Sequence, residues 1–292
     1  MADTTTTLAE RPAAQARRGL RLPKTGDWWH HALLITLLFM MAVPLLMMLN
    51  ISFKSLPQFS VNPYGVTLPL NPQSYVRAWT MIWRYIVNSI VVSGTTVIGV
   101  VVLATLTAWS FARYPFPGRE FLFYLILSLL MIPGELTLIP SFLLVKDLGL
   151  LNTRWVLILP YIAGGQVFAI FILRSFFEAM PEELFEAARI DGASEVKTFL
   201  QVAVPMANSI IGVVAIMNIT GTWNDLIWPM VTVNVRRLMT LTIGLYAFRN
   251  ETYTQWGPLM AGYTIASIPL IILFAFTSRL FVEGLGSGAI KV

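Results

Sequence analysis

The chain has 292 residues, of which 56% are hydrophobic and 12% are charged, and its mean hydropathy is +0.70. Soluble domains carry about 25% charged residues, so this composition excludes an ordinary soluble protein and indicates one that lies in a membrane. The absence of cysteine excludes disulfides, thiol catalysis and sulfur-ligated metals. The net charge of +5 requires no nucleic-acid partner.

Residues 1–27 are polar and rich in Thr, Ala and Arg, so they cannot bury enough apolar surface to fold alone. We predict a disordered cytoplasmic tail. A cleaved signal peptide is not expected, because the apolar run that follows is long and Asn50-Ile51-Ser52-Phe53 offers no cleavage site. An organellar transit peptide is the alternative for this segment, although Asp3 and Glu10 argue against it.

Six apolar runs reach the roughly 20 residues that a helix needs to cross a hydrocarbon core about 30 Å thick. Their residues are apolar consecutively rather than alternately, which excludes the short alternating strands of a membrane barrel. We therefore predict an all-α polytopic membrane protein with a single membrane domain at 28–283. The runs cover residues 30–52, 86–111, 119–145, 154–177, 206–232 and 258–282.

An even number of spans places both termini on one side of the membrane, and basic residues are more frequent in cytoplasmic segments. With both ends inside, twelve of the 20 Lys and Arg residues are cytoplasmic and eight are outside. We predict cytoplasmic termini in the cell membrane. The proline-rich segment 54–85 and the segment 233–257 are then outer loops.

Two of the predicted spans are interrupted. The third contains Pro133-Gly134-Glu135 and then Pro140, and the fifth contains Thr220-Gly221-Thr222-Trp223-Asn224-Asp225. Such breaks are tolerated where neighbouring helices or a water-lined cavity satisfy the freed backbone groups. These spans are candidates for the lining of a solute pathway.

Four residues in these breaks are candidate contacts for a solute. An ionisable side chain at membrane depth is costly unless it meets a partner or water, which points to Glu135 and Asp225. Trp223 can pack on the apolar face of a sugar ring, and Asn224 can bind hydroxyl groups. The alternatives are an interfacial position for the two carboxylates, and an interfacial tryptophan beside an asparagine that only packs helices.

A charged segment separates the fourth and fifth spans. Pro181 and two glutamates indicate a helix start, and Gly192 is typical of a helix end. Ser194 can cap a second short helix that ends near Phe199. The prediction is two short helices around a sharp bend, with Glu186 and Asp191 exposed. The alternative is an ordinary amphipathic loop whose charges are only solvated.

The motif Glu186-Ala187-Ala188, then Gly192, then Val202-Ala203-Val204-Pro205 resembles the EAA loop of ABC importer membrane subunits, with Val at both aliphatic positions of its last element. Further segments resemble carbohydrate-uptake permeases of the maltose type, and together they cover nearly all of the chain from residue 30. These segments are Asn88-Ser89, Phe116-Pro117-Gly118-Arg119, Trp223-Asn224-Asp225-Leu226-Ile227-Trp228-Pro229, Phe281-Val282-Glu283-Gly284-Leu285 and Gly288-Ala289-Ile290-Lys291.

This resemblance implies the fold of a type I ABC importer permease, with two short cytoplasmic coupling helices in the loop 180–203. The residues that it implies for coupling to an ATPase are Glu186, Ala187, Ala188, Asp191 and Gly192. It also implies that Gly284, Gly288 and Lys291, in a cytoplasmic tail at 284–292, contact the ATPase dimer. The implied partners are a second homologous permease, two ATPase chains and an extracytoplasmic solute-binding protein, besides membrane lipid.

We expect no cofactor, metal or active site on this chain. A phosphate-binding P-loop requires a Gly-Lys pair, and the sequence contains none. The glycine-rich segment 284–288 follows a span and opens no helix, so a nucleotide site is not expected there. His30 and His31 lack a third metal ligand. ATP and Mg are therefore expected on the partner ATPase.

The resemblance favours import of a di- or oligosaccharide and leaves three alternatives open. A permease for another solute such as glycerol phosphate would share every motif quoted above. An ion-coupled secondary carrier would use Glu135 or Asp225, although no internal repeat of the kind found in such carriers is evident. A membrane scaffold would use the charged loop to recruit an unrelated protein.

Overall fold

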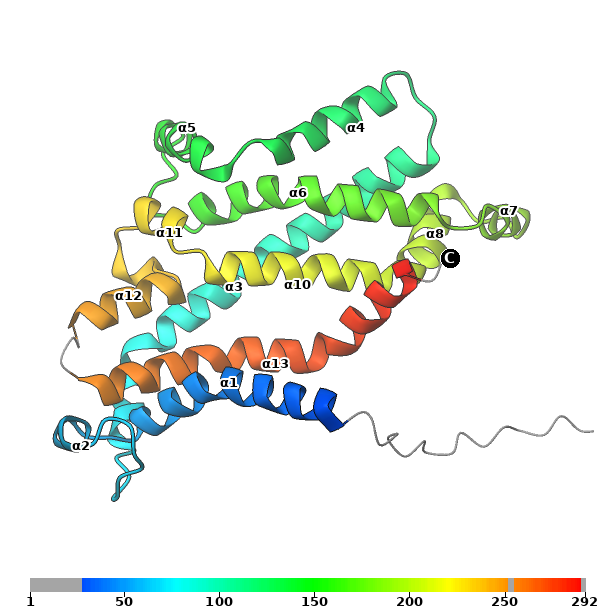
Figure 1. The fold of residues 1–292 in the computed structure, drawn as a ribbon. Coiled ribbons are helices and arrows are strands. Elements are labelled where there is room, and N and C mark those ends of the chain that lie inside the picture. The colour runs from blue at the N-terminus through cyan, green and yellow to red at the C-terminus, as the bar shows by residue number, and fades with distance from the viewer. Residues whose placement is uncertain (1–27, 252–254, 290–292) are drawn as a thin grey trace, which may run out of the picture. The chain divides into compact units, whose positions relative to one another are not determined.

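A computed structural model describes residues 28–251 and 255–289, and the secondary structure in these ranges is helical (Figure 1). The predicted tail at 1–27 lies outside the described residues. The long helices are α1 (Trp28–Ser52), α3 (Gln73–Arg113), α6 (Trp155–Glu178), α10 (Asn208–Asn224) and α13 (Trp256–Ala289). The shorter ones are α2 (Leu56–Val61), α4 (Arg119–Ser128), α5 (Gly134–Asp147), α7 (Glu183–Ile190), α8 (Glu195–Thr198), α9 (Val204–Met206), α11 (Ile227–Thr232) and α12 (Leu241–Glu251). Single turns of 3-10 helix lie at Leu129–Met131 and Arg236–Leu238, and Phe199–Ala203 forms a π-helix.

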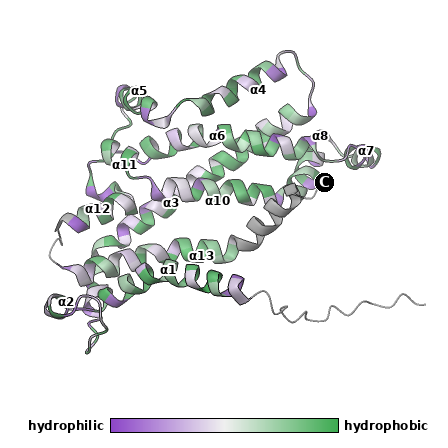
Figure 2. Cartoon of the chain, viewed as in Figure 1, coloured by the Kyte–Doolittle hydropathy of each residue, from purple (hydrophilic) through white to green (hydrophobic). Residues whose placement is uncertain are grey.

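The described helices confirm the prediction of an all-α polytopic membrane protein. Four of them, α1, α3, α6 and α13, are long and apolar enough to cross a membrane. Two bent pairs also qualify, one formed by 119–131 with α5 and the other by 195–206 with α10, which makes six spans if each pair is one span. Hydrophobic residues predominate along the long helices α1 and α6 and along the coloured part of α13 (Figure 2).

The chain divides into two compact units after Leu46. The first unit contains most of α1, whose side chains from Trp28 to Met41 are all exposed within it. A helix that is apolar on every side and makes so few internal contacts is suited to a lipid environment. The second unit begins at Met47 and contains every other element.

Small residues allow the helices of the second unit to pack closely around α3. A Cβ atom added to Gly99 would lie 2.4 Å from Cδ1 of Ile162 on α6. A Cβ atom added to Gly165 of α6 would lie 2.4 Å from Oδ1 of Asn218 on α10 and 2.8 Å from Cγ2 of Val100 on α3. Close approach through small residues is the usual way in which helices associate in membranes. Consequently α3, α6 and α10 form one tightly packed group.

Helix α3 begins earlier than the second span that was expected from residue 86. It begins at Gln73, directly after the last proline of the preceding loop, and continues for 41 residues. Ala78, Ile82 and Ile86 are buried on one face of its first half, where they pack with residues of α12 and α13. The expected outer loop therefore ends at Pro72. With a rise of 1.5 Å per residue, α3 is about 60 Å long, twice the thickness of a hydrocarbon core.

The third span is broken where the sequence predicted, but only once. The chain bends by 102° between residues 119–131 and α5, at Ile132 and Pro133. Pro140 lies inside α5 without ending it. A proline removes one backbone hydrogen bond, and α5 continues for seven residues beyond it.

Two further segments are more helical than predicted. The outer loop expected at 233–257 contains α12, and its apolar residues Leu241, Leu245 and Phe248 are buried. Helix α13 continues through Gly284 and Gly288 to Ala289, beyond the expected end of the last span at 282. Lys291 lies outside the described residues.

Candidate functional site

The charged segment after α6 folds into two short helices around a glycine turn, as predicted. Helix α7 ends where Gly192 adopts φ = 77°, a left-handed conformation that glycine reaches without strain. The N–H groups of Gly192 and Ala193 donate to the carbonyls of Arg189 and Ala188, at 3.0 and 2.9 Å. Ser194 then caps α8, because its Oγ accepts a hydrogen bond of 3.3 Å from the Lys197 N–H.

One face of α7 and of the turn is open to other molecules. Glu186, Ala187, Asp191 and Gly192 are exposed, Ala188 is half-buried, and the Ile190 side chain is 86% exposed. Within the described ranges, the carboxylates of Glu186 and Asp191 form no hydrogen bond or ion pair. An exposed isoleucine next to unpaired carboxylates is a surface on which another protein can dock.

The opposite face of α7 is anchored in the membrane domain by Phe185. This side chain is 1% exposed and makes an edge contact with Trp109 of α3, with ring centroids 5.3 Å apart. Trp109 also contacts Phe177 of α6 at 5.5 Å and Phe199 of the π-helix at 5.7 Å. Burial of large aromatic side chains dominates the energetics of such contacts. We did not predict Phe185 from the sequence, because its partners lie far away along the chain.

Arg113, the last residue of α3, joins three segments. Its Nη2 donates to the carbonyl oxygens of Phe177 and Met180 at 2.7 and 2.9 Å, which satisfies backbone groups at the end of α6. Its Nη1 forms an ion pair with Glu182 at 2.5 Å, and its guanidinium lies 4.1 Å from the centroid of the Phe185 ring. The end of α3, the end of α6 and the start of α7 are thus held by one side chain.

Weaker polar contacts continue this link to α8. Arg189 pairs with Glu182 at 3.5 Å and with Glu195 at 3.3 Å, and the Tyr114 hydroxyl donates to Glu195 at 3.1 Å. Burial and the neighbouring Glu195 carboxylate raise the pKa of Tyr114, so its hydroxyl stays a donor at neutral pH. Exposed ion pairs contribute about 0–1 kcal/mol each, so Phe185 and Arg113 dominate the attachment of α7.

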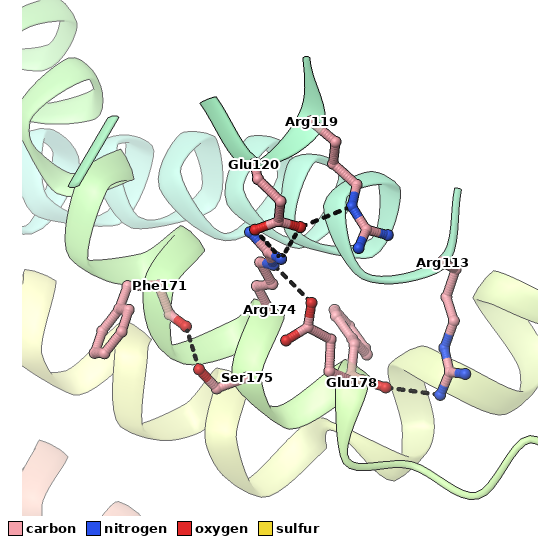
Figure 3. A network of polar contacts seen from close by, with 8 residues as sticks. Arg113, Arg119, Glu120, Phe171, Arg174, Ser175 and Glu178 are labelled. Carbon is pink, nitrogen blue, oxygen red and sulfur yellow. Dashed lines mark hydrogen bonds and ion pairs between the residues drawn. The ribbon is translucent and has the colours of Figure 1, made fainter. Parts of the chain in front are cut away.

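A second buried arginine connects α4 with α6 (Figure 3). The Arg174 side chain is 6% exposed, and its Nη2 donates to both carboxylate oxygens of Glu120 at 2.7 and 3.0 Å. Its Nε pairs with Glu178 at 2.7 Å, and its guanidinium lies 3.8 Å from the centroid of the Phe123 ring. Arg174 therefore fixes the first turn of the broken third span against the end of α6.

Replacing Arg174 by alanine should lower the free energy of unfolding by about 1–3 kcal/mol, because it removes charge-assisted hydrogen bonds, leaves Glu178 without its ion pair and leaves Glu120 with Arg119 alone. Arg119→Ala is the matched control, since Arg119 also pairs with Glu120, at 3.0 Å, but is more exposed. The control should change stability by less than about 0.5 kcal/mol. Thermal unfolding of both variants in detergent measures the difference. Equal losses would contradict this role for Arg174.

The structure brings Trp223 and Asn224 together. Both line a cavity of about 410 Å³ between α10, α12 and α13, together with Tyr246, Arg249 and Tyr263. Trp223 is 6% exposed, and Asn224 is exposed with its Nδ2 bonded to the Thr220 carbonyl at 3.0 Å, so its Oδ1 is left as an acceptor. Aromatic faces beside amide and guanidinium groups are suited to a hydroxyl-rich ring.

Asp225 is directed elsewhere and is satisfied within the chain. Its Oδ2 accepts a hydrogen bond of 2.8 Å from the Tyr161 hydroxyl. Its Oδ1 accepts from the Ile227 and Trp228 N–H groups at 3.0 and 3.4 Å, so it caps the start of α11. Asp225 therefore stabilises the break in the fifth span.

Glu135 lies apart from the other candidates, in the first turn of α5, where a carboxylate favourably meets the positive end of the helix dipole. It is exposed and lines none of the described cavities. The four candidate contacts thus separate into a pair, Trp223 with Asn224, and two carboxylates elsewhere.

A cavity that the sequence did not predict lies between α6 and α10. It has a volume of about 340 Å³ and is lined by Tyr161, Gly164, Gly221 and Thr222, among others. A Cβ atom added at Gly164 or Gly221 would meet nothing within 4 Å, so both glycines border open space rather than a packed helix. The glycines were visible in the sequence, but nothing in it placed them opposite each other.

Comparison with known proteins identifies the class of the chain. Residues 100–286 match the family described as binding-protein-dependent transport system inner membrane component. The chain belongs to this family of ABC transporter permeases. The permease is therefore a multi-pass protein of the inner membrane and a transport component rather than an enzyme, as the sequence predicted.

Curated relatives align along most of the permease. A probable ABC transporter permease, YurM of Bacillus subtilis, is 33% identical over 94% of this chain and 91% of its own length. The diacetylchitobiose uptake permease NgcG of Streptomyces coelicolor is 34% identical over 89% of this chain and 88% of its own. The arabinooligosaccharide permease AraQ of Halalkalibacterium halodurans is 32% identical over 87% and 92%.

A solved structure has a similar fold. In a crystal structure of a bacterial ABC transporter involved in the import of alginate, a chain 19% identical to the permease superposes with a TM-score of 0.76. The superposition covers 88% of the permease and 98% of that chain. The agreement confirms the permease fold along almost the whole length of that transporter chain.

Proposed function

We propose that this permease forms half of the translocation pathway of an ATP-driven importer for a di- or oligosaccharide, and that a separate ATPase drives it through α7 and α8. The observation that carries the proposal is the division of α7 into two faces. One face is exposed around Ile190, while the other is anchored through Phe185, which is 1% exposed.

The anchored face supplies a route for mechanical coupling. A partner that displaces α7 also displaces Phe185. Because Phe185 is closely packed in one buried cluster with aromatic side chains of α3 and α6, those side chains must move with it. Arg113 adds polar contacts between the same elements. Motion of α7 is thereby transmitted to α3 and α6, which pack directly on α10.

The positions of the partners follow from this route. The ATPase dimer, with its ATP and Mg, contacts the cytoplasmic residues Glu186, Ala187, Ala188, Asp191 and Gly192, and both termini lie on that side. Gly284, Gly288 and Lys291 are proposed as a further contact with the ATPase. A second, homologous permease completes the pathway, and an extracytoplasmic binding protein delivers the solute to the outer face.

Two observations support a sugar as the solute. Relatives at 32–34% identity are named for the uptake of diacetylchitobiose and arabinooligosaccharides. The cavity beside Trp223 combines aromatic rings with an amide and a guanidinium group, which are suited to carbohydrate rings and hydroxyls. A relative in Salmonella typhi, 30% identical over 70% of this chain, is named for sn-glycerol-3-phosphate, so the test includes that solute.

The test uses the intact complex of permeases and ATPases in nanodiscs or proteoliposomes. We expect the solute-loaded binding protein to stimulate ATP hydrolysis, and uptake to depend on ATP and to persist when ion gradients are collapsed. If glycerol phosphate stimulated ATP hydrolysis and no sugar did, glycerol phosphate would replace the sugar as the proposed substrate. Uptake that needs an ion gradient and no ATPase would contradict the proposal; the internal hydrogen bonds of Asp225 argue against such a carrier.

A further inference from the structure

A polar cavity lies at the end of α3 opposite to Arg113. Its volume is about 710 Å³, and it is enclosed by the first turns of α3 and α13 and by the segment that follows α1. These elements adjoin α2, at the end of the second unit away from α7 (Figure 1). Because α3 is about 60 Å long and apolar, the cavity and the coupling helices lie on opposite sides of the membrane.

Among the side chains that the structure describes, the cavity is lined by two cations and by no carboxylate. Lys54 is 1% exposed, and its three ammonium protons are directed to the carbonyl oxygens of Asn62, Pro63 and Gly65. These dipoles hold the lysine in place but do not cancel its charge. Burial lowers the pKa of the Lys54 ammonium, because it disfavours the charged form. The second cation, Arg77, lies on the first part of α3.

Two helix N-termini add to this positive potential. The first turns of α3 and α13 contribute Gln73, Ser74, Gly257 and Pro258 to the wall, and these helices are 41 and 34 residues long. No side chain caps the start of α3, where the preceding residue is Pro72. The free N–H groups at the start of α3, and the positive ends of the α3 and α13 dipoles, therefore lie in the wall that also contains Lys54 and Arg77.

Hydrogen-bond donors in the wall lack partners. Ser74 is 2% exposed, and its Oγ has no hydrogen-bond partner although it is buried at the cavity. A buried hydroxyl without a partner is costly unless something binds to it. Arg77 uses Nη1 to bind Oε1 of Gln255, which leaves most of its five N–H donors for another acceptor.

We propose that this cavity is a carboxylate socket that receives an acidic side chain of the extracytoplasmic binding protein. A carboxylate only accepts hydrogen bonds, so it matches the unpaired donors of Ser74 and Arg77, and its charge is opposite to that of Arg77. The family depends on a binding protein that visits the outer face. The inference rests on the proposed function in one respect, which is that α7 and α8 are cytoplasmic.

The test measures the dissociation constant of the labelled binding protein with the complete complex in nanodiscs. Arg77→Gln should raise this constant about tenfold or more, since it removes a charge-assisted hydrogen bond. Ser74→Ala should raise it about threefold without lowering the thermal unfolding midpoint, because the hydroxyl bonds to nothing in the permease itself. Arg84→Gln is the matched control: Arg84 is on the same helix, but it lies over the Trp83 ring, outside the cavity.

The control should change the dissociation constant by less than about twofold. Sodium acetate should weaken binding to the wild-type complex more than sodium chloride does at the same ionic strength. Acidic surface residues of the binding protein are then replaced by lysine one at a time. At one position, the lysine variant should bind the Arg77→Glu complex more tightly than it binds the wild-type complex. Such a rescue identifies the side chain that occupies the socket.

Three results would overturn the inference. Unchanged affinity in both Arg77→Gln and Ser74→Ala would show that the cavity does not contribute to docking. Equal losses in Arg77→Gln and Arg84→Gln would assign the effect to diffuse surface charge. A higher KM for an anionic solute, with unchanged affinity for the binding protein, would make the cavity a solute site. If the wild-type complex bound no binding protein at all, the proposed function would fail instead.

Discussion

Phe185→Ala is expected to reduce ATP-driven uptake at least tenfold while the complex continues to assemble and hydrolyse ATP. The substitution empties the space beside the Trp109 ring and removes the ring beneath the Arg113 guanidinium. A buried Phe→Ala change costs about 3–5 kcal/mol, which is enough to release a helix of eight residues from its support. Movement of α7 would then no longer reach α3. Parallel measurements of solute uptake and ATP hydrolysis in proteoliposomes give the ratio of solute to ATP.

Two neighbouring changes serve as controls for this experiment. Leu184→Ala alters the adjacent residue, which is 37% exposed, and should leave the coupling ratio within about twofold of the wild type. Phe185→Leu keeps most of the buried volume and should restore much of the uptake. If Phe185→Ala lowered the unfolding temperature but left the ratio of solute to ATP unchanged, Phe185 would be a stability residue without a role in coupling.

Gly192→Pro is expected to abolish uptake and transport-coupled ATP hydrolysis without preventing membrane insertion. The residue adopts φ = 77°, whereas proline is restricted to about −65°. Proline also removes the N–H that donates to the Arg189 carbonyl at 3.0 Å. The end of α7 must then change its geometry, which displaces Asp191 and Ile190 from the exposed face. Uptake, hydrolysis and the amount of membrane-inserted chain are measured together.

Gly149→Pro is the matched control, because it makes the same backbone change at a glycine outside the α7–α8 turn. Gly149 has φ = 69°, donates its N–H to the Lys146 carbonyl at 2.9 Å, and has open space around its Cβ position, as Gly192 does. It follows α5, far from α7 along the chain. This variant should retain most of the coupling between hydrolysis and uptake. Comparable loss in both variants, or full uptake with Gly192→Pro, would contradict the special role of the α7–α8 turn.

Local signals in the sequence predicted much of the fold. Long apolar runs identified α1 and α6 to within two residues, because lipid leaves few alternatives to a helix. Gly192 and Ser194 predicted the bend between α7 and α8, since each acts on its own backbone. Helix α3 begins 13 residues before the span predicted from residue 86, within the segment that was predicted to be an outer loop. No local sequence signal in residues 73–85 distinguishes an outer loop from a helix, because the apolar face of this helix is stabilised by packing on α12 and α13.

The anchoring residues could not be predicted for a related reason. Arg174 and Arg113 bind Glu120 and Glu182, which lie 54 and 69 residues away along the chain. Phe185 packs against Trp109 of a different helix. In the sequence each is one more aromatic or basic residue near a membrane boundary. Asp225 shows the opposite case. It stood out as an isolated charge at membrane depth, and its partners are Tyr161 and the start of α11.

Photo-crosslinking from Ile190 tests the central claim most directly. A photo-crosslinking amino acid placed at Ile190, which is 86% exposed, should capture the ATPase chain in intact cells. The same probe placed at Val66, which is 79% exposed in the segment between α2 and α3, should not capture it. Capture of the ATPase from Val66, or from neither position while the complex still co-purifies, would contradict the assignment of α7 and α8 as the place where the ATPase drives the permease.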